Sequence, residues 1–157
     1  MDPIILTILL SMSPVSELRG GIPYALAQGF NVYEAYFLCV LANILIAVFI
    51  MVFLTFLHES FMKLNVYRKT FDYFLERARK RSKKVEKSMG TLGYLALCIF
   101  VAIPLPMTGA WTGTLIAWLL GLNKLKSMAA IALGVAIAGI IVSFVALGAI
   151  SFLRFIL

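Results

Sequence analysis

Two long segments of the chain are apolar over almost their whole length. Residues 32–57 are apolar apart from Glu34 near the start and Asn43 in the body, and residues 128–153 form a second run. A helix that crosses a bilayer needs about 20 apolar residues. Both segments are therefore predicted to be membrane-spanning helices with some tilt. Asn43 is expected to hydrogen-bond a neighbouring helix rather than to contact a substrate.

Four shorter apolar runs form two pairs, and Pro and Gly interrupt each pair. Ten helical residues rise about 15 Å, which is half of a hydrocarbon core of about 30 Å. Each pair is therefore expected to enter the membrane, turn near its middle and return as a re-entrant hairpin. The return helices are expected to begin at Ile22-Pro23 and at Thr114. Four complete crossings are the alternative. The runs are residues 3–12, 24–29, 92–103 and 114–121.

The two halves of the sequence resemble each other. When the sequence is shifted by 92 residues, 18 aligned columns contain five identities, and hairpin, loop and long span recur in the same order. Average residue usage predicts roughly one identity. This pattern indicates an internal repeat, and one true crossing in each half makes the two units inverted. The identities are Pro14/Pro106, Gly21/Gly113, Ala25/Ala117, Gly29/Gly121 and Asn31/Asn123.

Composition supports an all-α integral membrane fold. Apolar residues make up 62% of the chain, and the mean hydropathy is +1.01. This is too apolar for an ordinary soluble domain, and two cysteines exclude a disulfide scaffold. We expect one membrane domain over residues 1–157, with repeat 1 at 1–57, a linker at 58–90 and repeat 2 at 91–157. Cys39 and Cys98 are expected to be buried free thiols.

Basic residues are concentrated in the linker. Residues 58–90 hold ten of the 14 Lys and Arg and carry a net charge of +6. Apolar positions recur there every three or four residues, which is typical of an amphipathic helix on anionic headgroups, here at residues 63–87. A solvated basic loop is the alternative. The excess of Lys and Arg predicts that the linker lies on the cytoplasmic side of the membrane, which is expected to be the plasma membrane. Lys124 and Lys126 then also face the cytoplasm. Nucleic acid is not expected as a partner.

The first hairpin tip carries two ionisable residues, Glu17 and Arg19. Such residues at membrane depth usually mark a substrate or ion pathway. Gly20 and Gly21 lack side chains, so their N–H groups are expected to approach a ligand, and Ser16 adds a hydroxyl. A helix N-terminus attracts anions, and Arg19 fits a phosphate or carboxylate. The tip therefore predicts a site for an anionic group. A purely structural Glu17–Arg19 pair is the alternative.

Glu17 is also the candidate for proton coupling. Burial favours the protonated carboxyl and Arg19 favours the ionised form, so the balance stays open. The second tip is uncharged and adds further candidate substrate-binding residues. No metal or other cofactor is expected, because the only histidine is His58 and no nucleophile or metal cluster is evident. The second-tip candidates are Thr108, Gly109, Trp111, Thr112 and Gly113.

The two tip sequences, SPVSELRGGIP at residues 13–23 and PLPMTGAWTG at residues 104–113, carry a resemblance. The chain resembles the putative small multidrug export protein family over essentially its whole length. That family is similar to the DedA/VTT superfamily, whose members have two re-entrant hairpins. They are linked to moving lipids such as polyprenyl phosphates, often with proton dependence. The resemblance implies that Glu17 is similar to the essential acidic residue of the first DedA hairpin. DedA proteins typically carry arginines in the second hairpin, and Arg19 is expected to substitute for them.

The sequence therefore predicts a transporter or flippase for an anionic lipid such as a polyprenyl phosphate, with possible proton coupling. One alternative is a proton-coupled exporter of small lipophilic compounds, although Arg19 counts against cationic ones. Another is a membrane-organising protein without transport activity. A membrane enzyme is the least favoured class. A homodimer is expected, since irregular hairpin tips need cover from lipid.

Overall fold

A computed structural model describes residues 2–61, 91–106 and 108–156. Every regular element in these ranges is an α-helix. Residues 62–90, which contain most of the predicted basic linker helix, lie outside the described residues. The helices are α1 (Pro3–Met12), α2 (Glu17–Ala27), α3 (Val32–Phe61), α5 (Thr91–Ala102), α6 (Ala110–Leu119) and α7 (Lys124–Ile156).

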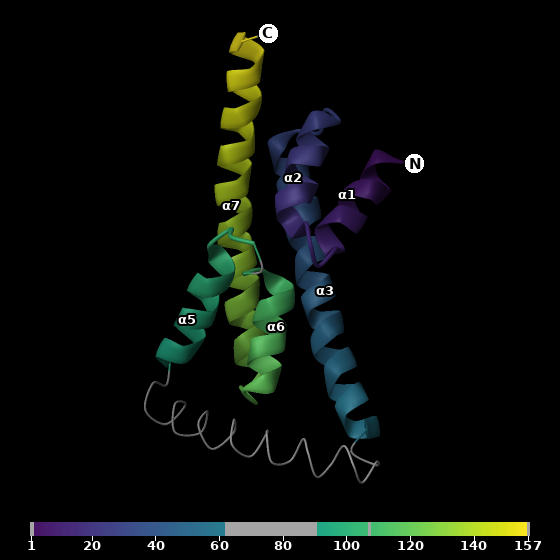
Figure 1. Cartoon of the computed structure of the whole chain (residues 1–157), viewed down its shortest axis with the longest axis vertical. Helices are drawn as coiled ribbons and strands as arrows, with labels where there is room; N and C mark the ends of the chain where they lie inside the picture. The colour runs from purple at the N-terminus through teal and green to yellow at the C-terminus, as the bar shows by residue number, and fades with distance from the viewer. Residues whose placement is uncertain (1, 62–90, 107, 157) are drawn as a thin grey trace.

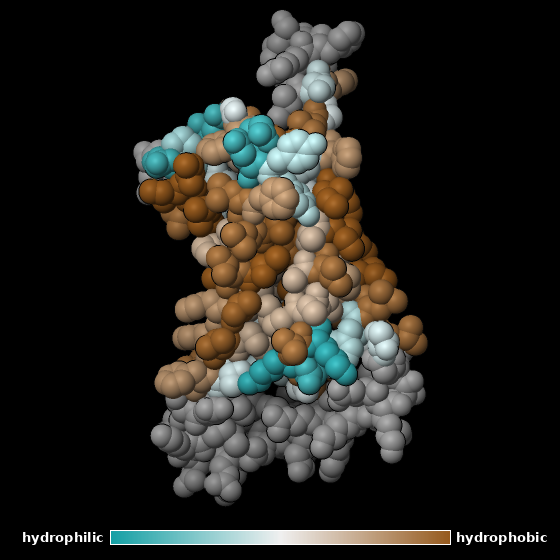
Figure 2. Space-filling model, turned by 180° about the vertical axis from the view of Figure 1, so that it is seen from behind, coloured by the Kyte–Doolittle hydropathy of each residue, from teal (hydrophilic) through white to brown (hydrophobic). Residues whose placement is uncertain are grey.

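Two of the helices, α3 and α7, are much longer than the others. They contain 30 and 33 residues, and their apolar windows Val32–Leu57 and Lys124–Ala149 are long enough to cross a membrane. The prediction of two long apolar helices is therefore confirmed. The exposed surface agrees with a membrane location, because an apolar band separates hydrophilic residues at its two ends (Figure 2). The chain is a membrane protein.

The four short helices form two pairs that approach from opposite ends of the molecule. Helices α1 and α2 lie beside one half of α3, whereas α5 and α6 lie toward the other end, and the two turns point to each other (Figure 1). Pro14 interrupts the first pair, and Pro104 and Pro106 interrupt the second. Proline lacks a backbone N–H and restricts the residue before it, so helices end there. Both helix breaks consequently meet near the middle of the molecule.

The turns that follow α2 and α6 have the same geometry. Gly29 and Gly121 adopt φ angles of 90° and 65°, which glycine reaches without a Cβ penalty. The next N–H in each turn bonds back to the carbonyl of Ala25 or Ala117, at 3.2 and 3.0 Å. This is the Schellman ending of a helix. These pairs of residues are 92 positions apart, so the local structure recurs at the spacing of the sequence repeat.

The helices that begin after these turns are also capped alike. The Oδ1 atom of Asn31 accepts hydrogen bonds from the first turn of α3, and Asn123 Oδ1 accepts from Lys126 N at 3.1 Å in the first turn of α7. Asparagine is a favoured N-cap residue. The cap explains why α7 begins at Lys124 and not at Met128, where the apolar run begins.

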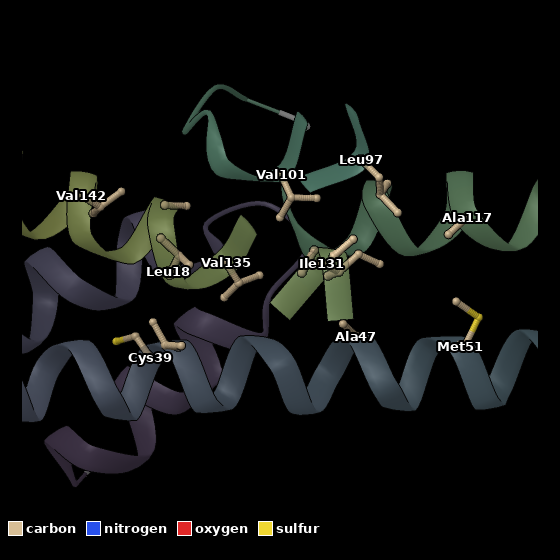
Figure 3. Packing of buried hydrophobic residues seen from close by; sticks show 14 of the residues in the cluster. Leu18, Cys39, Ala47, Met51, Leu97, Val101, Ala117, Ile131, Val135 and Val142 are labelled. Carbon is tan, nitrogen blue, oxygen red and sulfur yellow. The ribbon is translucent and has the colours of Figure 1, made fainter. Parts of the chain in front are cut away.

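Small residues let the long helices approach closely. A Cβ atom added to Gly139 of α7 would lie 2.7 Å from Val40 Cγ2 and 2.9 Å from Tyr36 Cε2 of α3. The Tyr36 hydroxyl donates to the carbonyl of Ala136 at 3.1 Å, which fixes the same contact. On another face of α7, a Cβ at Gly134 would lie 2.7 Å from the Cys98 carbonyl of α5. Buried residues of α2, α3, α5, α6 and α7 fill the space between these contacts (Figure 3).

Both return helices begin earlier than the sequence predicts. Helix α2 starts at Glu17, so Pro23 lies inside it, and α6 starts at Ala110, four residues before Thr114. The prediction that Ile22-Pro23 opens the return helix is wrong. The absence of a proline N–H removes only one helical hydrogen bond, which neighbouring groups tolerate in packed membrane helices.

Because α2 begins at Glu17, Gly20 and Gly21 lie inside a helix and not in the loop before it. Both lie within α2, and the Gly20 N–H donates to the Ser16 carbonyl at 3.1 Å, so it is not presented to a ligand. A Cβ at Gly21 would overlap Ser11 Oγ and approach Cys39 Sγ at 3.1 Å. Gly21 therefore brings α2 close to α1 and α3, and its predicted contact with substrate stays a prediction.

Candidate functional site

Hydrogen bonds join the two hairpin tips, and three of them are donated by Arg19 and Trp111. Arg19 Nη2 donates to Thr108 Oγ1 at 3.3 Å, and the Trp111 backbone N–H donates to Glu17 Oε1 at 3.3 Å. The Trp111 indole Nε1 donates to the Met12 carbonyl at 3.0 Å. All three join residues that are 89–99 positions apart in the chain. The candidate site is therefore formed by both halves of the protein.

Glu17 occupies the N-terminus of a helix to which it does not belong. Its side chain is only 6% exposed, and its carboxylate lies against the first residues of α6. The N-cap residue of α6 is Gly109, which supplies no capping side chain. A Cβ at Gly109 would overlap the Glu17 carboxylate. A helix N-terminus carries partial positive charge and unbonded N–H groups. The side-chain carboxyl of Glu17 thus caps α6 from the opposite hairpin.

The backbone of Glu17 is also unusual. Its φ angle is 48°, and it is the one residue other than glycine with positive φ in the described part of the chain. A left-handed conformation costs an L-residue about 1–2 kcal/mol. The preceding Ser16 hydroxyl donates to the Leu10 carbonyl at 2.6 Å and holds the turn closed. The strained turn directs the carboxylate of Glu17 toward α6.

Arg19 reaches a different part of the second tip. It is half-buried, and its partner Thr108 Oγ1 also bonds the carbonyls of Ile103 and Leu105, at 2.7 and 2.8 Å. Thr108 therefore holds the 103–108 loop together while it accepts from Arg19. Arg19 and Glu17 bind different partners on the second tip. A purely structural role for both residues stays the alternative.

Each of the last three backbone carbonyls of α1 accepts a hydrogen bond from a different side chain. Ser16 Oγ donates to the Leu10 carbonyl, Asn43 Nδ2 of α3 donates to the Ser11 carbonyl at 3.1 Å, and Trp111 donates to the Met12 carbonyl. A helix end inside an apolar protein needs such partners. The predicted interhelical hydrogen bond of Asn43 is confirmed. The role of the Met12 carbonyl was missed, because no side-chain pattern marks a backbone acceptor.

Other predicted site residues lie away from the contact between the tips. Gly113 packs on α5, since a Cβ there would lie 2.6 Å from Val101 Cγ2. Thr112 is half-buried in the first turn of α6. The structure thus joins six of the ten candidates and gives Gly20, Gly21 and Gly113 packing roles. The six are Ser16, Glu17, Arg19, Thr108, Gly109 and Trp111.

Cysteine and acidic residues do not suggest a metal site. Cys39 and Cys98 are free thiols, the first buried and the second half-buried. Over residues 2–61, 91–106 and 108–156, no group of three His, Cys, Asp or Glu is placed to hold a metal ion. At the tips, the side chains that could take part in chemistry are a carboxyl, a guanidinium, hydroxyls and an indole.

In the part of the chain that the structure describes, the regular elements are helices, and two of them are long and apolar enough to cross a membrane, which indicates an integral membrane protein. A comparison with known families is more specific. The family described as "Putative small multi-drug export protein" matches residues 17–141, and the chain belongs to this family. The match begins at Glu17, within the first tip, and includes the whole of the second tip. No curated protein and no solved structure matches the chain. The predicted family is thus confirmed, whereas the relationship to DedA stays a prediction.

Proposed function

We propose that the protein is a membrane transporter, not an enzyme, and that it moves an anionic lipid such as a polyprenyl phosphate. One observation carries the proposal. The N-terminus of α6 is an anion site inside the molecule, and a carboxylate of the protein itself occupies it through the 3.3 Å bond from Trp111 N to Glu17 Oε1. A site that holds a carboxylate also suits the phosphate of a lipid.

The topology that we propose has two re-entrant hairpins and two crossings related as an inverted repeat. Support comes from the opposite approach of the two helix pairs in Figure 1 and from the matching turns 92 residues apart. Many transporters place discontinuous helices from inverted repeats at the bilayer midplane. We further propose a location in the plasma membrane, a cytoplasmic linker at residues 58–90 that binds anionic headgroups at 63–87, and a homodimer.

The proposed mechanism is an exchange of anions at α6. While Glu17 is ionised, its carboxylate holds the N-terminus of α6 and excludes other anions. Protonation neutralises Glu17 and weakens this hold, since a helix N-terminus favours negative charge. A lipid phosphate then takes the position, and Arg19 supplies a second, forked donor. Release of the proton returns the carboxylate and expels the phosphate. Proton movement and lipid movement are thereby coupled at one group.

Export of small lipophilic compounds is the second candidate, because the family description names multidrug export. The two candidates differ at Arg19. A cationic compound is repelled by its guanidinium, whereas an anionic lipid is attracted. Neutral compounds do not depend on this charge, so the response to an Arg19 substitution separates the candidates.

The test is lipid movement in proteoliposomes. The lipids are a fluorescent polyprenyl phosphate and the matching neutral polyprenol. Movement between the leaflets is measured at several pH values as the fraction of each lipid that a quencher outside the vesicles can reach. We expect transport of the phosphate only. Arg19→Lys, which loses the fork, and Arg19→Ala are expected to slow it about tenfold or more, since a charge-assisted hydrogen bond contributes about 1.5–3 kcal/mol.

Glu17→Gln is expected to abolish the pH dependence, because the variant has no proton to exchange. Glu34→Gln is the matched control. Glu34 is exposed at the start of α3, where its Oε2 accepts from Asn31 N, and its loss removes the same charge. Equal movement of the phosphate and the neutral lipid, or full transport by Arg19→Ala, would contradict the proposal and favour export of neutral compounds. Wild-type pH dependence in Glu17→Gln would refute the coupling role of Glu17.

A further inference from the structure

A groove between α5 and α7 lies apart from the hairpin tips. It has a volume of about 550 Å³ and is lined by the first two turns of α5 and by the first half of α7. This volume is within the ~300–1,000 Å³ that is usual for small-molecule sites. The second tip follows Ala102 at the other end of α5, four residues and hence roughly 6 Å beyond Cys98, the last α5 residue that lines the groove. No residue of the contact between the tips lines the groove, so the groove is distinct from the site at α6.

The lining of the groove is apolar along its length and basic at one end. Leu95, Cys98 and Leu133 form part of the apolar wall, and Leu95 and Leu133 are 52% and 62% exposed. Lys126 and Tyr94 stand at the polar end, where Lys126 Nζ lies 5.9 Å from the centre of the Tyr94 ring. Among the residues that the structure describes there, no Asp or Glu lines the groove.

The polar end is held in place by the turn that precedes α7. The Asn123 backbone N–H donates to the Tyr94 hydroxyl at 3.3 Å, which ties α5 to this turn. The Tyr94 ring in turn faces the Lys126 ammonium, an attraction that orients a cation. Lys126 is thus held over the open end of an apolar groove, in contrast to a lysine that only extends to the membrane surface.

We propose that this groove binds one anionic phospholipid of the bilayer, with an acyl chain along the apolar wall and the phosphate at Lys126. The argument is complementarity of charge and of polarity. A lipid has one anionic end and a long apolar part, and the groove has a cation at one end of an apolar wall. Basic pockets between membrane helices are known to bind lipid headgroups.

The chain provides a matched control for this site. Lys124 and Lys126 are both exposed in the first turn of α7, but only Lys126 lines the α5–α7 groove. Lys124 lines a different hollow with Met51 and Phe56 of α3. If the basic surface attracts lipid only through its overall charge, substitution of either lysine should weaken binding equally. If the lipid binds in the groove, only the Lys126 substitution should weaken it.

The experiment is native mass spectrometry of the purified full chain in detergent, with phosphatidylglycerol or phosphatidylcholine added. We expect one phosphatidylglycerol to remain bound and phosphatidylcholine to bind weakly. Lys126→Gln is expected to lower binding about fivefold or more, and Lys124→Gln to leave it unchanged. Ala129→Phe, which fills the groove and keeps both lysines, is expected to reduce binding as well. Glycerol 3-phosphate, which has the headgroup chemistry without a chain, is expected not to compete.

Three results would overturn the proposal: an equal loss from the two lysine variants, equal binding of the two lipids, or unchanged binding in Ala129→Phe. Competition by glycerol 3-phosphate would also overturn the proposal, because the acyl chain of the lipid would then contribute nothing to binding. Circular dichroism of each variant checks that the helices are retained. The proposal rests on the membrane location of the protein and is independent of transport, so a failure of either leaves the other standing.

Discussion

Replacement of Gly109 by alanine tests whether the Glu17 carboxylate really caps α6. The backbone of Gly109 has φ −95° and ψ −160°, which alanine adopts freely, so the substitution causes no backbone strain. The added Cβ overlaps the Glu17 carboxylate and must displace it. Overpacking costs about 1–3 kcal/mol, and a lost carboxylate at a helix N-terminus costs about 1 kcal/mol more. We expect Gly109→Ala to lower the free energy of unfolding by about 2–4 kcal/mol.

A double-mutant cycle separates this contact from general damage. In a Glu17→Gly background the overlapping group is absent, so Gly109→Ala should be neutral or stabilise by a few tenths of a kcal/mol to about 1 kcal/mol. The coupling energy between the two positions is then about 2–5 kcal/mol. Unfolding is followed in mixed micelles by the loss of the helical circular dichroism signal as sodium dodecyl sulfate is added. Gly93→Ala is the control, because nothing lies within 4 Å of a Cβ there.

The reasoning is refuted if Gly109→Ala has the same effect with and without the Glu17 side chain. The overlap would then be relieved by movement of the loop, and the carboxylate would not hold α6. A large loss in Gly93→Ala would show that the chain is sensitive to any glycine substitution. In that case the cycle would carry no information on the cap.

Three further predictions concern packing and backbone. Glu17→Gly should be more stable than Glu17→Ala by about 1 kcal/mol in the same denaturation assay, since only glycine adopts a φ of 48° without cost. Gly139→Ala should destabilise by about 1–3 kcal/mol through the crowded α3–α7 contact, whereas Gly148→Ala, where a Cβ meets nothing within 4 Å, should not. Asn43→Leu should destabilise by about 1–2 kcal/mol, because the buried Ser11 carbonyl loses its donor; an unchanged midpoint would show that the hydrogen bond contributes nothing.

The parts of the fold that depend on local sequence were predictable. A run of apolar residues from Val32 to Leu57 is long enough to span a bilayer whatever surrounds it, and the structure has a helix there. The helix breaks were equally predictable from Pro14, Pro104 and Pro106, because proline acts through its own ring. The amphipathic helix and headgroup contacts predicted in the linker stay predictions.

The exact helix starts and the contacts between the tips were not predictable in the same way. A proline such as Pro23 usually marks the first turn of a helix, but here Gly21 packs on Ser11 and α2 begins six residues before Pro23. The cap of α6 was hidden because its carboxylate comes from Glu17, 94 residues earlier than Trp111. Sequence reasoning identified Glu17 as important by its cost in a membrane, but only the structure pairs it with Gly109.

The capping of α1 has a consequence for biosynthesis. The Met12 carbonyl finds its donor on Trp111, 99 residues further along the chain. At about 5–20 residues per second, the ribosome needs roughly 5–20 s to synthesise that partner after the first hairpin is made. During this interval the Met12 carbonyl of the nascent first half lacks the donor that it has in the complete protein. The hydrogen bonds of the first hairpin are thus complete only after the second hairpin has been made. Each half should therefore be degraded when it is expressed alone, and the two halves should protect each other from degradation when they are expressed together.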